Sequence, residues 1–219
     1  MTALISKIMS EVLQKIKDQK IVPLFYNDSF EVSKNIIRAL YEAGIRVIEY
    51  TNRGHQALEN FTRLKAISST EFPGLLLGIG TVKNIEEMDD FAYAKADFII
   101  TPVISEALVK HALEKKIFLI PGCFTPSDIN IAYQNGLTLV KIFPADALGK
   151  NYIKSIQPVF PGMNFMPTGG INAELEDIME WLNGGAIAAG LGSSLIGKDS
   201  NEEELTLKTK KLLQQLNHN

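Results

Sequence analysis

The chain has 219 residues, of which 46% are hydrophobic and 21% charged, and its formal net charge is −3. This composition is typical of a soluble globular protein and gives no electrostatic reason to expect a nucleic-acid partner. No stretch approaches the ~20 apolar residues that a membrane span needs. The single cysteine, Cys123, excludes an intrachain disulfide and favours a reducing cytoplasm.

Short apolar runs alternate with amphipathic segments along the chain. The first predicted element is an amphipathic helix over residues 5–16, with one apolar face formed by Ile5, Ile8, Met9, Val12 and Ile16. Eight strands are predicted after it, at Ile21–Tyr26, Arg46–Thr51, Leu75–Gly80, Phe98–Thr101, Phe118–Pro121, Leu137–Phe143, Asn164–Pro167 and Ala186–Gly190.

Helices are predicted between these strands. They cover Val32–Glu42, Ala57–Ala66, Ile85–Ala94, Ser105–Lys115, Pro126–Gln134, a segment within 146–157, and Leu175–Asn183, and a closing helix carries Leu205, Leu212, Leu213 and Leu216. Ser29 and Asp128 are predicted helix starts. The left-handed position at a helix end is predicted at Gly44, Gly136 and Gly184.

Strands that alternate with helices indicate a parallel sheet. Eight such units without a large insertion favour a closed (β/α)8 barrel, an α/β TIM barrel, with an extra N-terminal helix. No linker or low-complexity tract divides the chain, so residues 1–219 are predicted to form a single domain. The length is near the lower limit of this fold, roughly 200 residues.

Two charged residues interrupt the apolar strands of this predicted barrel. Glu49 shares a strand face with Val47 and Thr51, and Lys141 shares one with Leu139 and Phe143, because side chains alternate along a strand. A charge buried alone costs several kcal/mol. Both are tolerable if they face each other at the C-terminal ends of the strands, where barrel active sites lie.

A chemical role for this pair competes with a structural one, in which the two form an ion pair or the lysine extends to solvent. Arg53, which lies two residues beyond Thr51, favours chemistry. A desolvated lysine near a second cation has its pKa lowered from ~10.4, and its neutral amine attacks a ketone to form a Schiff base. Glu49 would then transfer protons and Arg53 would bind a substrate carboxylate.

Glycines and hydroxyl residues follow the last two strands, at Thr168-Gly169-Gly170 and Gly192-Ser193. Barrels often bind phosphate at these two loops, because glycine lets backbone N–H groups approach the anion. The alternative is a pair of ordinary tight turns. His55, His111 and His218 are scattered, so no zinc-ligand set is predicted.

Seven segments in order carry a resemblance to a known family: Val22–Phe25, Gly44–Arg53, Gly78–Val82, Ile120–Pro126, Val140–Ala145, Pro167–Ile171 and Gly190–Leu195. The set resembles the KDPG/KHG aldolases, class I aldolases acting on 2-keto-3-deoxy-6-phosphogluconate (KDPG) and 4-hydroxy-2-oxoglutarate (KHG). The resemblance spans nearly the whole chain. It implies reversible cleavage to pyruvate and an aldehyde, which is glyceraldehyde 3-phosphate or glyoxylate.

The resemblance also implies a role for each matching residue. Lys141 matches the Schiff-base lysine and Glu49 the general acid/base. Arg53 and Thr81 match contacts to the pyruvate carboxylate and the substrate. Phe143 matches an aromatic ring packed over the pyruvyl group, and Thr168 a polar contact to the substrate. Gly169, Gly170 and Ser193 match the phosphate cradle, and Gly192 beside them is also expected to bind the substrate. A homotrimer without metal or organic cofactor is implied.

Two positions depart from the family pattern. The family usually has Ser-Pro-Gly where this chain has Thr101-Pro102-Val103, and a Trp is common at the position of Ser194. The preferred substrate therefore stays open among phosphogluconate, phosphogalactonate and hydroxyoxoglutarate derivatives. From the residues alone, two other classes also stay open: a barrel isomerase or decarboxylase without a covalent step, and a phosphate-ligand sensor that has lost catalysis.

Overall fold

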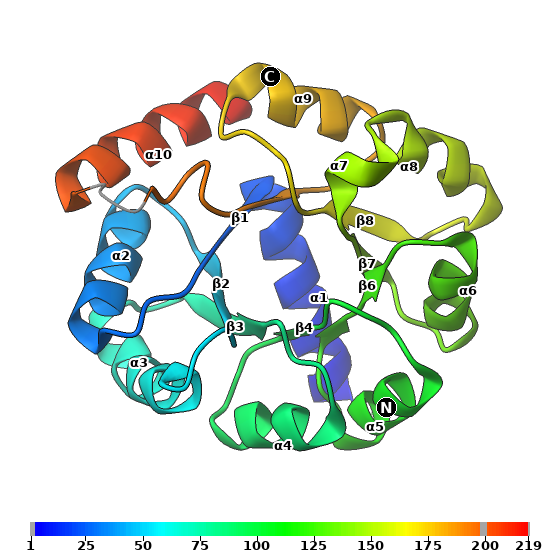
Figure 1. Ribbon diagram of the computed structural model, residues 1–219, viewed down its shortest axis with the longest axis horizontal. Helices are drawn as coiled ribbons and strands as arrows, with labels where there is room; N and C mark the ends of the chain where they lie inside the picture. The colour runs from blue at the N-terminus through cyan, green and yellow to red at the C-terminus, as the bar shows by residue number, and fades with distance from the viewer. Residues whose placement is uncertain (1–2, 198–200, 219) are drawn as a thin grey trace.

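Helices surround a curled layer of parallel strands in the computed structural model, which describes residues 3–197 and 201–218, with side chains from Ser10 onward (Figure 1). The strands are β1 Ile21–Phe25, β2 Val47–Thr51, β3 Leu76–Gly80, β4 Ile99–Ile100, β5 Leu119–Ile120, β6 Gly122–Cys123, β7 Leu139–Ile142, β8 Asn164–Pro167 and β9 Ala189–Leu191. The helices are α1 Ala3–Gln19, α2 Phe30–Glu42, α3 Ala57–Glu71, α4 Ile85–Tyr93, α5 Glu106–Lys115, α6 Pro126–Gln134, α7 Ala145–Leu148, α8 Asn151–Ile156, α9 Leu175–Asn183 and α10 Glu202–Asn217, with a 3-10 turn at Gln157–Val159.

The strands form two sheets in which every pairing is parallel, as the alternation of elements predicted. One sheet has the order β5-β4-β3-β2-β1-β9 and the other the order β6-β7-β8. An isolated parallel bridge joins Thr168, just after β8, to Gly190 in β9. The Ile187 N–H also donates to the Phe165 carbonyl over 3.0 Å, so the edges of the two sheets meet.

The fifth predicted strand, Phe118–Pro121, differs from expectation, since the described residues hold nine strand segments rather than eight. Pro121 divides β5 from β6 because a proline has no N–H to donate. The segment changes partner at this point: β5 pairs with β4, whereas β6 pairs with β7. The Pro121 carbonyl still accepts a hydrogen bond from the Lys141 N–H over 2.9 Å.

Two local predictions about helix ends need correction. Gly184 has φ −73°, and the left-handed residue is Gly185 at φ 104°, one position later. Asp128 does not begin its helix, because Thr125 caps it and Asp128 completes the capping box from the third helical position. The helix expected within 146–157 is α8, Asn151–Ile156, and Gly149 at φ 79° separates it from the short helix α7. Ser29, Gly44 and Gly136 have the conformations predicted.

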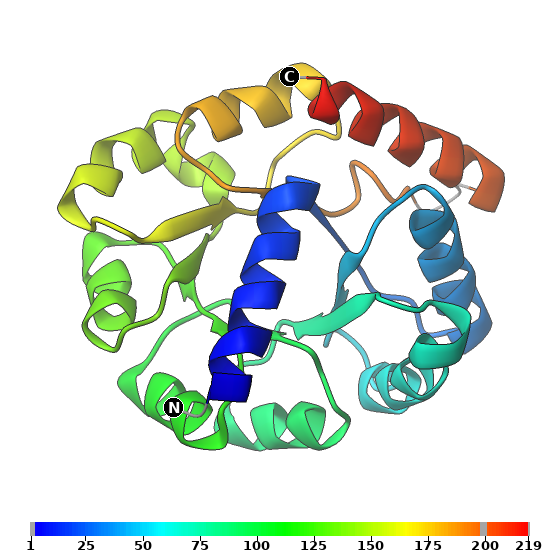
Figure 2. The same cartoon turned by 180° about the vertical axis from the view of Figure 1, so that it is seen from behind.

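Two apolar cores hold the layers together. The outer core lies between strands and surrounding helices and includes Trp181, which is buried. The inner core lies inside the curl of the strands, and Val12 and Ile16 of α1 pack into it with the inward residues Val22, Val47, Phe98, Ile100, Phe118, Ile120, Leu139, Met166 and Ala188. Figure 2 shows α1 lying across the N-terminal ends of the strands. Ile5, Ile8 and Met9 lie outside the described side chains.

Gln19, the last residue of α1, fastens this helix to the starts of β1 and β2. Its side-chain Nε2 donates to the carbonyls of Ile21 (2.6 Å) and Val47 (2.9 Å). Its Oε1 accepts from the N–H groups of Arg46 (2.5 Å) and Val47 (2.9 Å). One side-chain amide therefore satisfies four backbone groups at the N-terminal end of the strands, which α1 covers and which is called the closed end below. The opposite, C-terminal end of the strands is not covered by α1.

None of the helices in the described part of the chain combines the length and hydropathy needed to cross a membrane.

Candidate active site

Lys141 and Glu49 meet inside the curl of the strands, one inward position beyond the core residues Leu139 and Val47. Both are buried, with 5% of Lys141 and 1% of Glu49 exposed. The distance from Lys141 Nζ to Glu49 Oε1 is 3.9 Å, which is an ion-pair contact rather than a hydrogen bond. The prediction that the two charges face each other is confirmed.

The Glu49 carboxylate is held in place without hydrogen bonds. Neither carboxylate oxygen has a hydrogen-bond partner among the described residues. Burial raises the pKa of Glu49 above its usual value, and the positive charges of Lys141 and Arg53 oppose that rise. A carboxyl group with a raised pKa and unused lone pairs is suited to accept and donate protons during a reaction.

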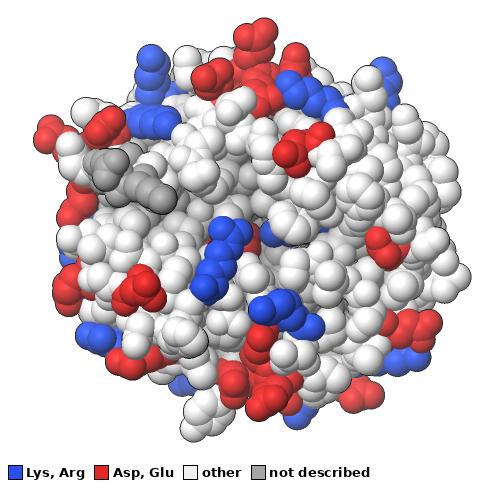
Figure 3. All heavy atoms as spheres, viewed as in Figure 1, with Lys and Arg blue, Asp and Glu red and all other residues white. Residues whose placement is uncertain are grey.

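A cavity of about 300 Å³ opens above this pair at the C-terminal ends of the strands. Its lining includes eight predicted residues: Arg53, Lys141, Phe143, Thr168, Gly169, Gly170, Gly192 and Ser193. Figure 3 shows this face with a central hollow, basic side chains beside it, and charges of both signs spread around the periphery. The size and mixed polarity of the cavity suit a small polar metabolite.

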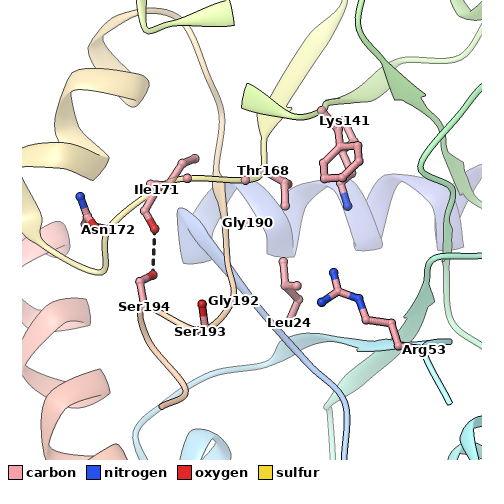
Figure 4. Close-up of a pocket in the computed structure, with 13 residues that line it drawn as sticks. Leu24, Arg53, Lys141, Thr168, Ile171, Asn172, Gly190, Gly192, Ser193 and Ser194 are labelled. Carbon is pink, nitrogen blue, oxygen red and sulfur yellow. Dashed lines mark hydrogen bonds between the residues drawn. The ribbon is translucent and has the colours of Figure 1, made fainter. Parts of the chain in front are cut away.

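Lys141 and Arg53 lie at one end of this cavity. Figure 4 shows the Lys141 amine and the Arg53 guanidinium pointing into the same space, from β7 and from the loop after β2. No described carboxylate forms an ion pair with Arg53, so its guanidinium is available to a ligand. The Lys141 Nζ also lies 4.8 Å from the centre of the Phe143 ring, which covers the amine with an aromatic face.

Backbone N–H groups dominate the other end of the cavity. Gly169 and Gly170 have φ values of 103° and 70°, which side-chain-bearing residues rarely adopt. No described residue accepts a hydrogen bond from the N–H groups of Gly169, Gly170, Ser193 or Ser194. Two loops thus present free donors to one space, as an anion site requires.

Thr168 lies between these two ends and is buried, with 4% of its surface exposed. Its hydroxyl has no hydrogen-bond partner in the described structure. Gly190 leaves the room for it, because a Cβ at that position would lie 2.3 Å from Thr168 Oγ1. An unpaired buried hydroxyl that lines a cavity is available to a bound ligand.

Thr81, the remaining predicted contact, does not line the cavity. It follows β3 with φ 63°, a conformation that is costly for a β-branched residue. Its predicted substrate contact stays a prediction. Val103 is about half exposed and is not part of the lining either, whereas Ser194 is.

The cavity also contains residues to which no substrate contact was assigned from the sequence: Leu24, Ile171, Asn172, Gly190 and Ser194. Leu24 and Ile171 follow the apolar pattern of core residues, so no local signal distinguishes them. Within residues 3–197 and 201–218, no group of three His, Cys, Asp or Glu side chains converges as a metal site.

Comparison with known proteins identifies the family of the chain that carries this buried lysine and buried glutamate. A family model described as KDPG and KHG aldolase matches residues 12–211. The chain belongs to the KDPG and KHG aldolase family. It is therefore an aldolase, a carbon–carbon lyase of class I.

Individual relatives agree with the family assignment. The chain is 36% identical over 155 residues to the KHG/KDPG aldolase of Escherichia coli K12, covering 69% of this chain and 70% of that one. It is 34% identical over 152 residues to the 2-dehydro-3-deoxy-phosphogluconate aldolase of Zymomonas mobilis, covering 69% and 71%.

Solved structures of the family superpose over most of the chain. The KDPG aldolase of Zymomonas mobilis ZM4 with 3-phosphoglycerate gives a TM-score of 0.84 at 29% identity, covering 93% of this chain and 95% of that one. The KDPG aldolase of Legionella pneumophila, with pyruvate captured as a covalent carbinolamine intermediate, gives 0.83 at 28% identity, covering 90% and 96%.

Proposed function

We propose that the protein cleaves KDPG reversibly to pyruvate and glyceraldehyde 3-phosphate through a Schiff base on Lys141, and that it also accepts KHG. The observation that carries this proposal is the buried Lys141–Glu49 contact of 3.9 Å at the floor of the cavity. The carboxylate beside the amine has no other polar partner in the described structure. A purely structural ion pair gains most when hydrogen bonds satisfy its remaining lone pairs, and these are unsatisfied.

The proposed reaction begins when the Lys141 amine attacks the C2 ketone. Glu49 transfers protons while the carbinolamine forms and water leaves, which yields the Schiff base. The C4 hydroxyl then loses its proton to the carboxylate as the C3–C4 bond breaks. The aldehyde departs, and its bond electrons remain in an enamine on Lys141. Protonation at C3 and addition of water to the imine release pyruvate and restore the amine.

The two ends of the cavity support the proposed orientation of the substrate. Arg53 provides a planar cation for the C1 carboxylate, and Phe143 covers the pyruvyl group beside the amine. The free N–H groups of Gly169, Gly170 and Ser193 are suited to a phosphate at the distal end. We propose Thr168 as a polar contact between the two ends, Gly192 as part of the phosphate cradle, and Thr81 as a further contact at the mouth.

The same proposal extends to architecture and assembly. We infer that residues 1–219 form a single closed (β/α)8 barrel, with β5 and β6 as one strand and the Thr168–Gly190 bridge at the seam. We further propose a homotrimer that works in the cytoplasm on a small-molecule 2-keto acid, without metal or organic cofactor. Sedimentation of the purified chain tests the trimer.

A trapping experiment tests the covalent step. Incubation with pyruvate and sodium borohydride is expected to place a reduced pyruvyl adduct on the peptide that contains Lys141, as determined by mass spectrometry. A parallel assay follows pyruvate release from KDPG and from KHG. If cleavage proceeds while Lys141 carries no adduct after reduction, the Schiff-base mechanism is wrong.

A further inference from the structure

The distal end of the cavity lacks a cation in its own lining. Among the described residues, the lining includes two basic side chains, Arg53 and Lys141, and Figure 4 shows both at the end opposite Ser193 and Ser194. The donors at the distal end are neutral N–H groups. A phosphate monoester carries a charge of about −1.5 to −2 at pH 7, so a nearby positive charge would favour its binding.

One lysine outside the lining reaches the backbone of the distal loop. Lys208, in the second turn of α10, donates from Nζ to the Ser194 carbonyl over 2.7 Å. The Ser194 hydroxyl in turn donates to the Ile171 carbonyl over 2.8 Å and ties the loop after β9 to the loop after β8. The ammonium group of Lys208 is thereby held against the loop that presents the Ser193 and Ser194 N–H groups.

The Lys208 charge is not neutralised within the described structure. No described carboxylate forms an ion pair with it, and the bond to Ser194 uses one of its three N–H donors. A lysine acts as a point charge on a flexible stem, so it does not need to face the phosphate directly in order to attract it. The attraction is screened by salt, because the residue is exposed.

We propose that Lys208 is a specificity-determining residue that favours phosphorylated over unphosphorylated substrates by supplying positive charge to the distal end of the cavity. This inference rests on the proposed cleavage of KDPG. Lys208 takes no part in the covalent step, and its effect concerns the binding of the distal phosphate. It therefore changes KM for a phosphorylated substrate while the rate of Schiff-base formation with pyruvate is unchanged.

The test compares Lys208→Gln, Lys208→Arg and the control Lys210→Gln. Lys210 lies on the same helix, but it lines a different cavity, with Gln19 and Arg46 at the closed end of the strands. Each variant is assayed with KDPG and with its dephosphorylated counterpart, 2-keto-3-deoxygluconate, at low and high ionic strength. Inorganic phosphate serves as a competitive probe of the distal site, and pyruvate trapping monitors the covalent step.

Lys208→Gln is expected to raise KM for KDPG about fivefold at low salt, as an exposed charge interaction would, with no change for 2-keto-3-deoxygluconate. Inorganic phosphate should inhibit the Lys208→Gln variant more weakly than the wild type, and the KM of this variant for KDPG should lose much of its salt dependence. Lys208→Arg should restore the inhibition by phosphate and the salt dependence of KM. A Lys208→Gln variant with wild-type KM and salt dependence overturns the inference. An equal rise in KM for both substrates also overturns it, because it would indicate a structural role. Failure of the wild type to cleave KDPG or trap pyruvate instead overturns the proposed function.

Discussion

The Glu49 carboxylate occupies the space into which a side chain at Gly80 would project. A Cβ at position 80 would lie 1.6 Å from Glu49 Oε1 and 2.5 Å from the carboxyl carbon. The two residues lie on neighbouring strands, β2 and β3. The absence of a side chain at Gly80 is therefore a condition for Glu49 to reach Lys141.

Gly80→Ala is expected to lower kcat by about 10²-fold or more, because it displaces Glu49, the proposed general acid/base. The decisive measurement is a double-mutant cycle with Glu49→Gln. If Gly80 acts only through Glu49, the alanine substitution costs little further activity in the Glu49→Gln background. If Gly80→Ala lowered kcat equally in the wild-type and Glu49→Gln backgrounds, this relationship would be contradicted and general damage to β3 would be indicated.

Glu49→Gln is expected to stabilise the folded protein at neutral pH. Burial raises the folded-state pKa of Glu49 above its ordinary value. In the wild type, the stability linked to this group is therefore present at acidic pH, and it is lost as the pH rises through the raised pKa. Glutamine removes that loss, which amounts to about 1.4 kcal/mol per unit of pKa difference. Urea unfolding of both proteins from pH 4 to 8 should show an advantage of the variant that grows with pH. An advantage that shrinks with pH would show that the assigned direction is wrong.

Lys141→Met is expected to abolish turnover while the protein remains folded. Methionine fills a similar volume in the interior and lacks the amine that we propose forms the Schiff base. Loss of the positive charge also removes one influence that lowers the pKa of Glu49, so this carboxyl group should take up a proton more readily. Pyruvate release and circular dichroism together test the prediction. Residual turnover well above background would indicate that another group forms the covalent bond.

Gln19→Ala is expected to lower the free energy of unfolding by about 4 kcal/mol, since four hydrogen bonds of roughly 1 kcal/mol each are lost. Gln14→Ala is the matched control, because within the described structure the Gln14 side chain bonds only Asp18, which is exposed on the same helix. Denaturant midpoints measure the difference. The kcat of Gln19→Ala should match the wild type below its unfolding temperature, because the active site lies at the opposite end of the strands.

Sequence periodicity determined the parallel alternation of strands and helices, and strand parity placed Glu49 and Lys141 on inward faces before any contact was known. The glycines after the last two strands likewise predicted the two loops that line the cavity, because backbone conformation and side-chain direction are local properties. These features can be predicted because each depends only on residues that are close together in the sequence.

Only the tertiary structure decided how distant residues meet. The space at Gly80 filled by Glu49, the three bonds of Gln19 to Arg46 and Val47, and the contact of Lys208 with Ser194 join segments 14 to 31 positions apart. The division of the fifth strand at Pro121 depends on a change of neighbour from β4 to β7. Such contacts follow from packing and from the curling of the strands around a shared interior, which leave no periodic trace in the sequence.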